Sequence, residues 1–299
     1  MNFVIFQFAG GNVFFLGAGL LAISLALLAR LRGIVARSFG RALFLVGCAG
    51  IACSGTPLNR WIYLALGSLA VACLIACEAP RTARFSRIRA MIGVLFCTTM
   101  AGVWVSEGLH RVAPKIRISS SQPVYVAGDS VSAGVGSGTK LWPEVLGDST
   151  KLKVVNLAKA GATASSTMRQ ATAIGPGHSL VLLEIGGNDI LGGTNPKDFR
   201  AALDALLSRL TSDGHQVVMF ELPLPPFCNA YGEAQRSLAR RYGISMIPKT
   251  CLANVFAKQD ATTDGIHLTQ AGQTALAGAV EKMLVVRPDA DRGPATMSP

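Results

Sequence analysis

The chain has 299 residues, half of them hydrophobic, and a formal net charge of +11. The charge is uneven, because residues 1–121 hold 12 of the 28 Lys and Arg residues but only two of the 17 acids. These basic residues stand between apolar stretches, as the flanks of membrane spans do, and this spacing argues against a nucleic-acid-binding surface.

Four apolar stretches open the chain, and we expect each of them to form a transmembrane helix. They cover residues 3–29, 42–59, 61–78 and 90–107. A helix of about 20 residues crosses the roughly 30 Å of a bilayer's hydrocarbon. One such stretch could be a buried helix of a soluble protein, but four in succession predict a membrane region over residues 1–109. The first stretch lacks the basic start and the small-x-small cleavage site of a signal peptide.

The arginines set the expected orientation of these helices. Clusters follow the first and the third stretch, and they are Arg30, Arg32, Arg37, Arg41, then Arg81, Arg84, Arg87 and Arg89. Basic loops stay in the cytoplasm. We therefore expect a multi-pass protein of the cell (inner) membrane, with the N-terminus and the C-terminal domain on the periplasmic side. Its expected partner is the lipid bilayer, and transport is not expected, because the spans carry no internal charge.

A polar, Ser-rich linker is expected over residues 110–122, before a second domain over 123–286. In this domain short apolar runs alternate with helical patterns. The runs predict strands at residues 124–127, 152–157, 180–185, 217–222 and 244–247. Alternating strands and helices indicate a three-layer α/β/α domain with a mainly parallel five-stranded sheet. The tail, residues 287–299, is expected to be disordered.

Polar or glycine-rich turns follow the predicted strands, and one more precedes the last predicted helix. They are Gly128-Asp129-Ser130, the segment from Asn156 to Gly161, Gly186-Gly187-Asn188-Asp189 and Asp264-Gly265-Ile266-His267. In parallel sheets, sites lie beyond the carboxyl ends of the strands. We therefore expect these turns to meet at one edge of the sheet.

The residues in these turns fit nucleophilic catalysis. A serine hydroxyl needs a base to remove its proton. His267 has Asp264 three residues earlier, close enough for the carboxylate to orient the ring and leave its other nitrogen for Ser130. The remaining histidines, His110, His178 and His215, are expected at the surface or in caps. Acyl transfer also needs hydrogen-bond donors for an oxyanion, which the Ser130 and Gly161 backbones and the Asn188 side chain can supply.

Each of these turns alone is as well explained by ordinary turn chemistry, since Gly, Asp, Asn and Ser dominate turns. A D-x-x-H pair alone is as well explained by a surface ion pair. Together, in this order on successive strands, they indicate a site.

The segments "GDSVSAG", "WPEVL", "EIGGND" and "DGIH" resemble the SGNH (GDSL-type) hydrolase family over roughly residues 124–284. The resemblance is strongest to the bacterial thioesterase/lysophospholipase branch. It implies Ser130 as nucleophile, His267 as base and Asp264 as its partner, with Ser130, Gly161 and Asn188 forming the oxyanion hole. Asp129 and Asp189 would hold their loops by hydrogen bonds. Val131 departs from the leucine that is common in the family, a mild apolar exchange.

The leading hypothesis is a membrane-anchored serine esterase that needs no metal or cofactor. It would hydrolyse an acyl ester, such as a lysophospholipid, another lipid or an acylated envelope substrate. One alternative is an O-acyltransferase that acts on an envelope glycan with the same triad. Another is an inactive binding or scaffold module. The sequence leaves the oligomeric state open.

Cysteines divide between the two parts of the chain. Cys228 and Cys251 are the two that lie beyond the membrane region. In an oxidising compartment they could form a disulfide, although the sequence does not establish the geometry.

Overall fold

The computed structural model describes residues 2–30, 33–79, 82–136 and 138–288. The chain divides into two compact units. The first holds Phe3–Val112 together with Pro223–Glu233, and the second holds Ala113–Leu222 and the chain from Ala234 onward.

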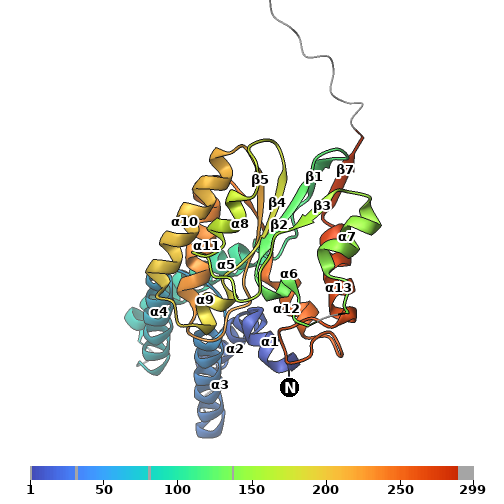
Figure 1. The fold of residues 1–299 in the computed structure, drawn as a ribbon. Coiled ribbons are helices and arrows are strands. Elements are labelled where there is room, and N and C mark those ends of the chain that lie inside the picture. The colour runs from blue at the N-terminus through green and yellow to red at the C-terminus, as the bar shows by residue number, and fades with distance from the viewer. Residues whose placement is uncertain (1, 31–32, 80–81, 137, 289–299) are drawn as a thin grey trace, which may run out of the picture. The chain divides into compact units, whose positions relative to one another are not determined.

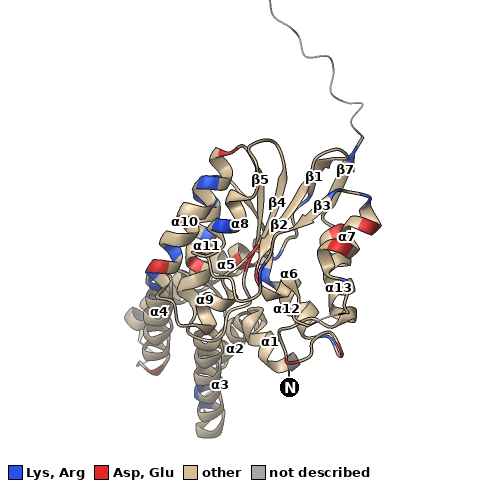
Figure 2. Ribbon diagram, viewed as in Figure 1, with Lys and Arg blue, Asp and Glu red and all other residues tan. Residues whose placement is uncertain are grey.

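The first unit is helical. Its N-terminal helices are α1 (Asn2–Ala9), α2 (Asn12–Arg30), α3 (Ile34–Cys53), α4 (Arg60–Glu78) and α5 (Ala83–Leu109). Four helices among the described residues, in α2 to α5, are long and apolar enough to cross a membrane. Figure 2 shows them largely without charged residues. The four expected helices are therefore present.

The bounds of these helices differ from the predicted spans at several places, since α3 also ends at Cys53 instead of residue 59 and α5 begins at Ala83 instead of residue 90. The first span is broken at Gly10-Gly11, because Gly11 has a φ of 76° that ends α1 before α2 begins. The second begins earlier than predicted, at Ile34, so Arg37 and Arg41 lie within α3 instead of a loop.

Both arginines of α3 find a partner on α4. The Arg41 guanidinium lies 2.8 Å from a Glu78 carboxylate oxygen, and that of Arg37 lies 3.4 Å from the other oxygen. Arginine is itself a good helix former, and the Glu78 carboxylate gives both guanidinium groups an ionic partner.

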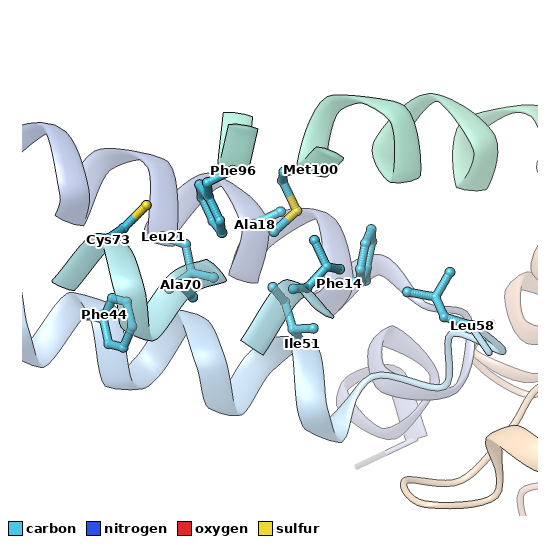
Figure 3. Packing of buried hydrophobic residues seen from close by; sticks show 11 residues of the cluster. Phe14, Ala18, Leu21, Phe44, Ile51, Leu58, Ala70, Cys73, Phe96 and Met100 are labelled. Atoms are coloured by element: carbon cyan, nitrogen blue, oxygen red, sulfur yellow. The ribbon is translucent and has the colours of Figure 1, made fainter. Parts of the chain in front are cut away.

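Helices α2 and α3 pack closely through glycines. A Cβ on Gly17 would lie 2.7 Å from the Gly47 carbonyl oxygen and 2.9 Å from the Ile51 nitrogen. Figure 3 shows the apolar core of this unit, to which α2 contributes Phe14 and α5 contributes Phe96. The core therefore depends on the close approach of the α2 and α3 backbones, which have no side chain between them at Gly17.

The second unit is an α/β domain with two parallel sheets. Its strands are β1 (Ile116–Ser119), β2 (Val124–Gly128), β3 (Val154–Asn156), β4 (Leu180–Glu184), β5 (Gln216–Phe220), β6 (Ser245–Ile247) and β7 (Leu284–Arg287). The main sheet has five strands in the order β3-β2-β4-β5-β6, and every neighbouring pair is parallel (Figure 1). This confirms the predicted five-stranded parallel sheet.

Helices cover both faces of the main sheet (Figure 1). On one face lie α7 (Trp142–Thr150), α12 (Lys249–Phe256) and α13 (Gln270–Glu281); on the other lie α8 (Met168–Thr172), α10 (Pro196–Ser212) and α11 (Asn229–Tyr242). The apolar face of α10 is fully buried at Phe199, Leu203, Leu206, Leu207 and Leu210. The domain therefore has the three predicted layers.

The second sheet was not predicted. Strand β1 lies inside the segment expected to be a linker, and it pairs with β7 from Ile116↔Leu284 to Ser119↔Arg287. Strand β7 also includes Arg287, the first residue of the tail that was expected to be disordered. Residues 289–299 of that tail lie outside the described residues.

Cys228 and Cys251 are free thiols in this structure, and their pairing stays a prediction. Cys251 lies within α12, and burial raises the pKa of its thiol to about 11. A thiol with so high a pKa carries little of the thiolate that disulfide exchange requires.

We predict that Gly17→Ala destabilises the helical unit. The added methyl group meets backbone atoms that have nowhere to move, and overpacking of this kind costs about 1–3 kcal/mol, which exceeds the gain in helix propensity. Gly19→Ala is the matched control, because nothing lies within 4 Å of a Cβ there. Thermal unfolding of the full-length protein in detergent should show a lower Tm for Gly17→Ala and no loss for Gly19→Ala. Equal Tm values would contradict close packing at Gly17.

Candidate active site

The turn after β2 places Ser130 at the start of a short helix, α6 (Ser130–Ala133). Asp129 caps this helix, because its carboxylate accepts a hydrogen bond of 3.0 Å from the Val131 N–H. Ser130 is half-buried. Its own N–H has no acceptor among the described residues, as is usual for the first residue of a helix. The turn thus presents a hydroxyl and a free N–H group together.

The turn after β3 lies against the turn after β4. Gly161 has a φ of 76°, a left-handed conformation that favours glycine, and its N–H also has no acceptor within the described part of the chain. The Asn188 amide, on α9 (Gly187–Leu191), donates to the Ala162 carbonyl oxygen at 3.0 Å. This bond brings Asn188 next to Gly161, so two of the predicted oxyanion donors lie in adjoining turns.

Asp264 holds His267 by its side chain and its backbone. One carboxylate oxygen lies 2.5 Å from the His267 Nδ1 atom. The other accepts the N–H groups of His267 at 2.9 Å and of Ile266 at 3.0 Å. Hydrogen bonds from the His267 N–H, the His267 ring and the Ile266 N–H lower the pKa of Asp264 far below its usual range. Asp264 therefore stays ionised and holds the His267 ring through its Nδ1 atom.

The His267 ring interacts electrostatically with Asp129, the residue that caps the helix beginning at Ser130. Burial raises the pKa of Asp129, while the Val131 N–H, a hydrogen bond from Glu184 and the His267 ring partly oppose this effect. Burial likewise raises the pKa of Asp189, whose carboxylate accepts the Ala164 N–H at 2.9 Å. Asp129 thus holds its own turn by a hydrogen bond, whereas Asp189 holds the segment that follows β3.

Among the described residues, no group of three or more His, Cys, Asp or Glu side chains is placed to bind a metal ion. One expectation about the other histidines was wrong. His215 is buried, and its Nδ1 atom lies 2.8 Å from the Ser179 hydroxyl oxygen. It therefore helps to pack the start of β4 and is not a surface residue.

Two further polar side chains support the Ser130 turn: Gln170, which the sequence analysis did not name, and Asn156, the first residue of the predicted turn after the second strand. Gln170, on α8, donates from its amide to the Gly128 carbonyl oxygen and accepts the Gly128 N–H, both at 2.9 Å. The Asn156 amide donates to the Ser132 carbonyl oxygen at 2.8 Å. Gln170 thus makes the two hydrogen bonds that the backbone of a neighbouring strand would make to the end of β2. No local sequence pattern reveals this role.

Comparison with known proteins gives a family for this domain. The model of the GDSL-like Lipase/Acylhydrolase family matches residues 126–275. The chain is 27% identical over 192 residues to the thioesterase 1/protease 1/lysophospholipase L1 of Escherichia coli strain K12, a match covering 60% of this chain and 92% of that protein. It is 28% identical over 180 residues to an arylesterase of Vibrio mimicus, covering 56% and 90%.

Among solved structures, the psychrotrophic esterase EstA of a Pseudoalteromonas species has a TM-score of 0.50 and 19% identity. The match covers 55% of this chain and 96% of that chain. At this identity the likeness concerns the fold of the α/β domain alone.

We predict that Gln170→Met destabilises the α/β domain. Methionine has a similar volume but cannot pair with the Gly128 backbone, and each buried polar group left unpaired costs about 1–3 kcal/mol. Gln216→Met, at an exposed position of β5, is the control. Chemical unfolding of the full-length protein should show a lower midpoint for Gln170→Met than for Gln216→Met. Matching midpoints would show that the Gln170 amide contributes nothing.

Proposed function

Because the chain belongs to the GDSL-like Lipase/Acylhydrolase family of ester hydrolases, we propose that Ser130 is its nucleophile, His267 its general base and Asp264 the partner of that base. The observation that carries the proposal is the 2.5 Å contact between Asp264 and the His267 ring. It fixes the ring through Nδ1 and leaves Nε2 for the serine hydroxyl, which is the division of roles that a triad needs.

The proposed reaction has two halves. In the first, the Ser130 Oγ atom attacks the carbonyl carbon while its proton passes to His267 Nε2. The bond to the leaving alcohol or thiol then breaks, and the leaving group takes that proton. In the second, water gives its proton to His267, attacks the acyl-serine and releases the carboxylic acid, and the proton returns to Ser130.

The oxyanion of both tetrahedral intermediates would be stabilised by the N–H groups of Ser130 and Gly161 and by the Asn188 amide. Two facts support this assignment: both N–H groups lack an acceptor within the described residues, and the Asn188 amide lies beside Gly161. Donors arranged before the reaction act where the charge develops, and removal of one costs about 10²–10³ in kcat.

We also propose where the enzyme works: in the cell (inner) membrane, with the catalytic domain outside the cytoplasm. The four apolar helices and the arginines that follow the first and third of them support this orientation. The proposed substrates are acyl esters or thioesters at or near the membrane, such as a lysophospholipid, another lipid ester or an acylated envelope glycan. The names of the two relatives, a thioesterase/lysophospholipase and an arylesterase, support this class.

A substrate panel given to the full-length protein in liposomes tests this class. Release of free fatty acid from lysophospholipid supports the hydrolase. Acyl transfer to an added glycan hydroxyl in place of water would indicate an O-acyltransferase that uses the same triad.

We predict that Ser130→Ala abolishes ester hydrolysis while the fold is retained. Loss of a triad serine costs on the order of 10⁶ in kcat. The measurement is hydrolysis of a short p-nitrophenyl ester together with labelling by a fluorophosphonate probe. Ser132→Ala is not a suitable control, because the Ser132 hydroxyl donates a hydrogen bond to Glu184. Ser149→Ala, on the outer part of α7, is the control instead and should keep both signals. Labelling that persists in Ser130→Ala would identify a different nucleophile.

We predict that Asp264→Asn lowers kcat strongly with little change in KM. The amide can donate to Nδ1 and so favours the wrong ring tautomer, a change that costs on the order of 10⁴. Asp198→Asn, an exposed position at the start of α10, is the control. Steady-state kinetics of both variants provide the measurement, and a fully active Asp264→Asn protein would remove Asp264 from the mechanism.

A further inference from the structure

Two buried carboxyl groups lie together at the Ser130 turn. Glu184 is the last residue of β4, opposite Gly128 in the β2–β4 ladder, and it is 2% exposed. Its carboxyl group lies within hydrogen-bonding reach of the Asp129 carboxyl group and of the Asp129 backbone N–H. Two carboxyl groups can form such a bond only when one of them carries a proton.

The surroundings place that proton on Glu184. Burial raises the pKa of Glu184 well above its ordinary value, and the neighbouring Asp129 raises it further. Asp129 instead has the Val131 N–H at 3.0 Å and the His267 ring nearby, both of which favour its ionised form. Burial and Asp189, on α9, raise the pKa of Asp129, but the pKa of Glu184 is raised further, so the proton lies on Glu184. The pair thus holds one proton and one charge.

The Glu184 side chain is oriented by neighbours on its other side. The Trp142 indole N–H donates to the Ser132 hydroxyl at 3.2 Å, and that hydroxyl donates to Glu184 Oε2 at 3.0 Å. A Cβ on Gly128 would lie 3.1 Å from the same oxygen and 2.5 Å from the Glu184 carbonyl oxygen. The carboxyl group therefore fills the space that a side chain at residue 128 would need.

We propose that Glu184 is a positioning residue of the hydrolase reaction, whose protonated carboxyl group donates a hydrogen bond to Asp129 and so holds the turn that presents Ser130. The inference rests on the proposed function, because it concerns the same site. It makes a specific chemical demand: the group at residue 184 must be neutral, with one donor for Asp129 and one acceptor for Ser132. A glutamine side chain meets this demand, and a carboxylate or an aliphatic side chain does not.

The test compares Glu184→Gln with Glu184→Leu in the full-length protein in detergent. Glu281→Gln, an exposed position on α13, is the control for the change from carboxyl to amide. Hydrolysis of a short p-nitrophenyl ester gives kcat and KM. We expect Glu184→Gln to keep wild-type kcat within a few fold. Glu184→Leu should lose on the order of 10² in kcat with little change in KM, because a small displacement of a reacting group has an effect of that size.

The pH dependence separates positioning from packing alone. A raised pKa means that the native state favours the protonated form, so the stability contributed by Glu184 is present at low pH. It is lost as pH rises through the raised value. Both kcat and Tm of the wild type should therefore fall at the alkaline side, and Glu184→Gln should move both losses to higher pH. Glu281→Gln should leave both curves unchanged.

The results that overturn the inference are distinct from those that overturn the proposed function. If the wild type shows neither hydrolysis nor fluorophosphonate labelling, the function fails and the inference fails with it. If the wild type is active but Glu184→Gln loses as much kcat as Glu184→Leu, the neutral acid is not the working form. A folded Glu184→Leu protein with wild-type kcat also overturns the inference. If Glu184→Leu does not fold, the Glu184→Gln pH curves decide, and curves identical to wild type refute it.

Discussion

The close approach of β2 and β4 at Gly128 is the constraint on which the candidate active site depends. No side chain fits at this residue, because the backbone and the carboxyl group of Glu184 occupy the space where a Cβ would stand. The Gly128 backbone is held on its other side by the Gln170 amide. Contacts on both sides of β2 therefore hold the Gly128 backbone in place. The strand ends there, and two residues later Ser130 begins α6. The nucleophile turn is therefore held by buried polar contacts that originate in neighbouring strands and helices.

Much of the fold could be predicted because it follows from periodic patterns. Apolar stretches of the right length identified four helices, and alternating strands and helices identified a parallel sheet of five strands. The bounds were less predictable where distant partners intervene. Helix α3 includes Arg37 and Arg41, because arginine ends a membrane span without ending a helix, and Glu78 of the next helix lies beside both. The glycine pair at residues 10–11 could have been recognised as a break, since glycine is a poor helix former.

The site was predictable in part for the same reason. Turns at the carboxyl ends of parallel strands must lie at one edge of the sheet, so Gly161 and Asn188 could be expected together, and the contact between Asn188 and Ala162 agrees with this. Asp264 and His267 are close in sequence, and the turn brings their side chains into contact. Gln170 could not be found in this way, since its role depends on the docking of α8 at the end of β2. Glu184 did leave a signal, as an acid within a run of buried apolar residues.

The pairing of β1 with β7 joins the first and last strands of the α/β domain. During synthesis β1 leaves the ribosome soon after α5, whereas its partner β7 is made only when almost all of the domain is complete. Contacts between residues so far apart in the chain form slowly, because a long loop must close first. Strand β1 must then wait, unpaired, until β7 has been made. This small sheet is therefore completed only after the strands of the main sheet have been made, and a chain that ends before Leu284 would leave β1 with an open edge.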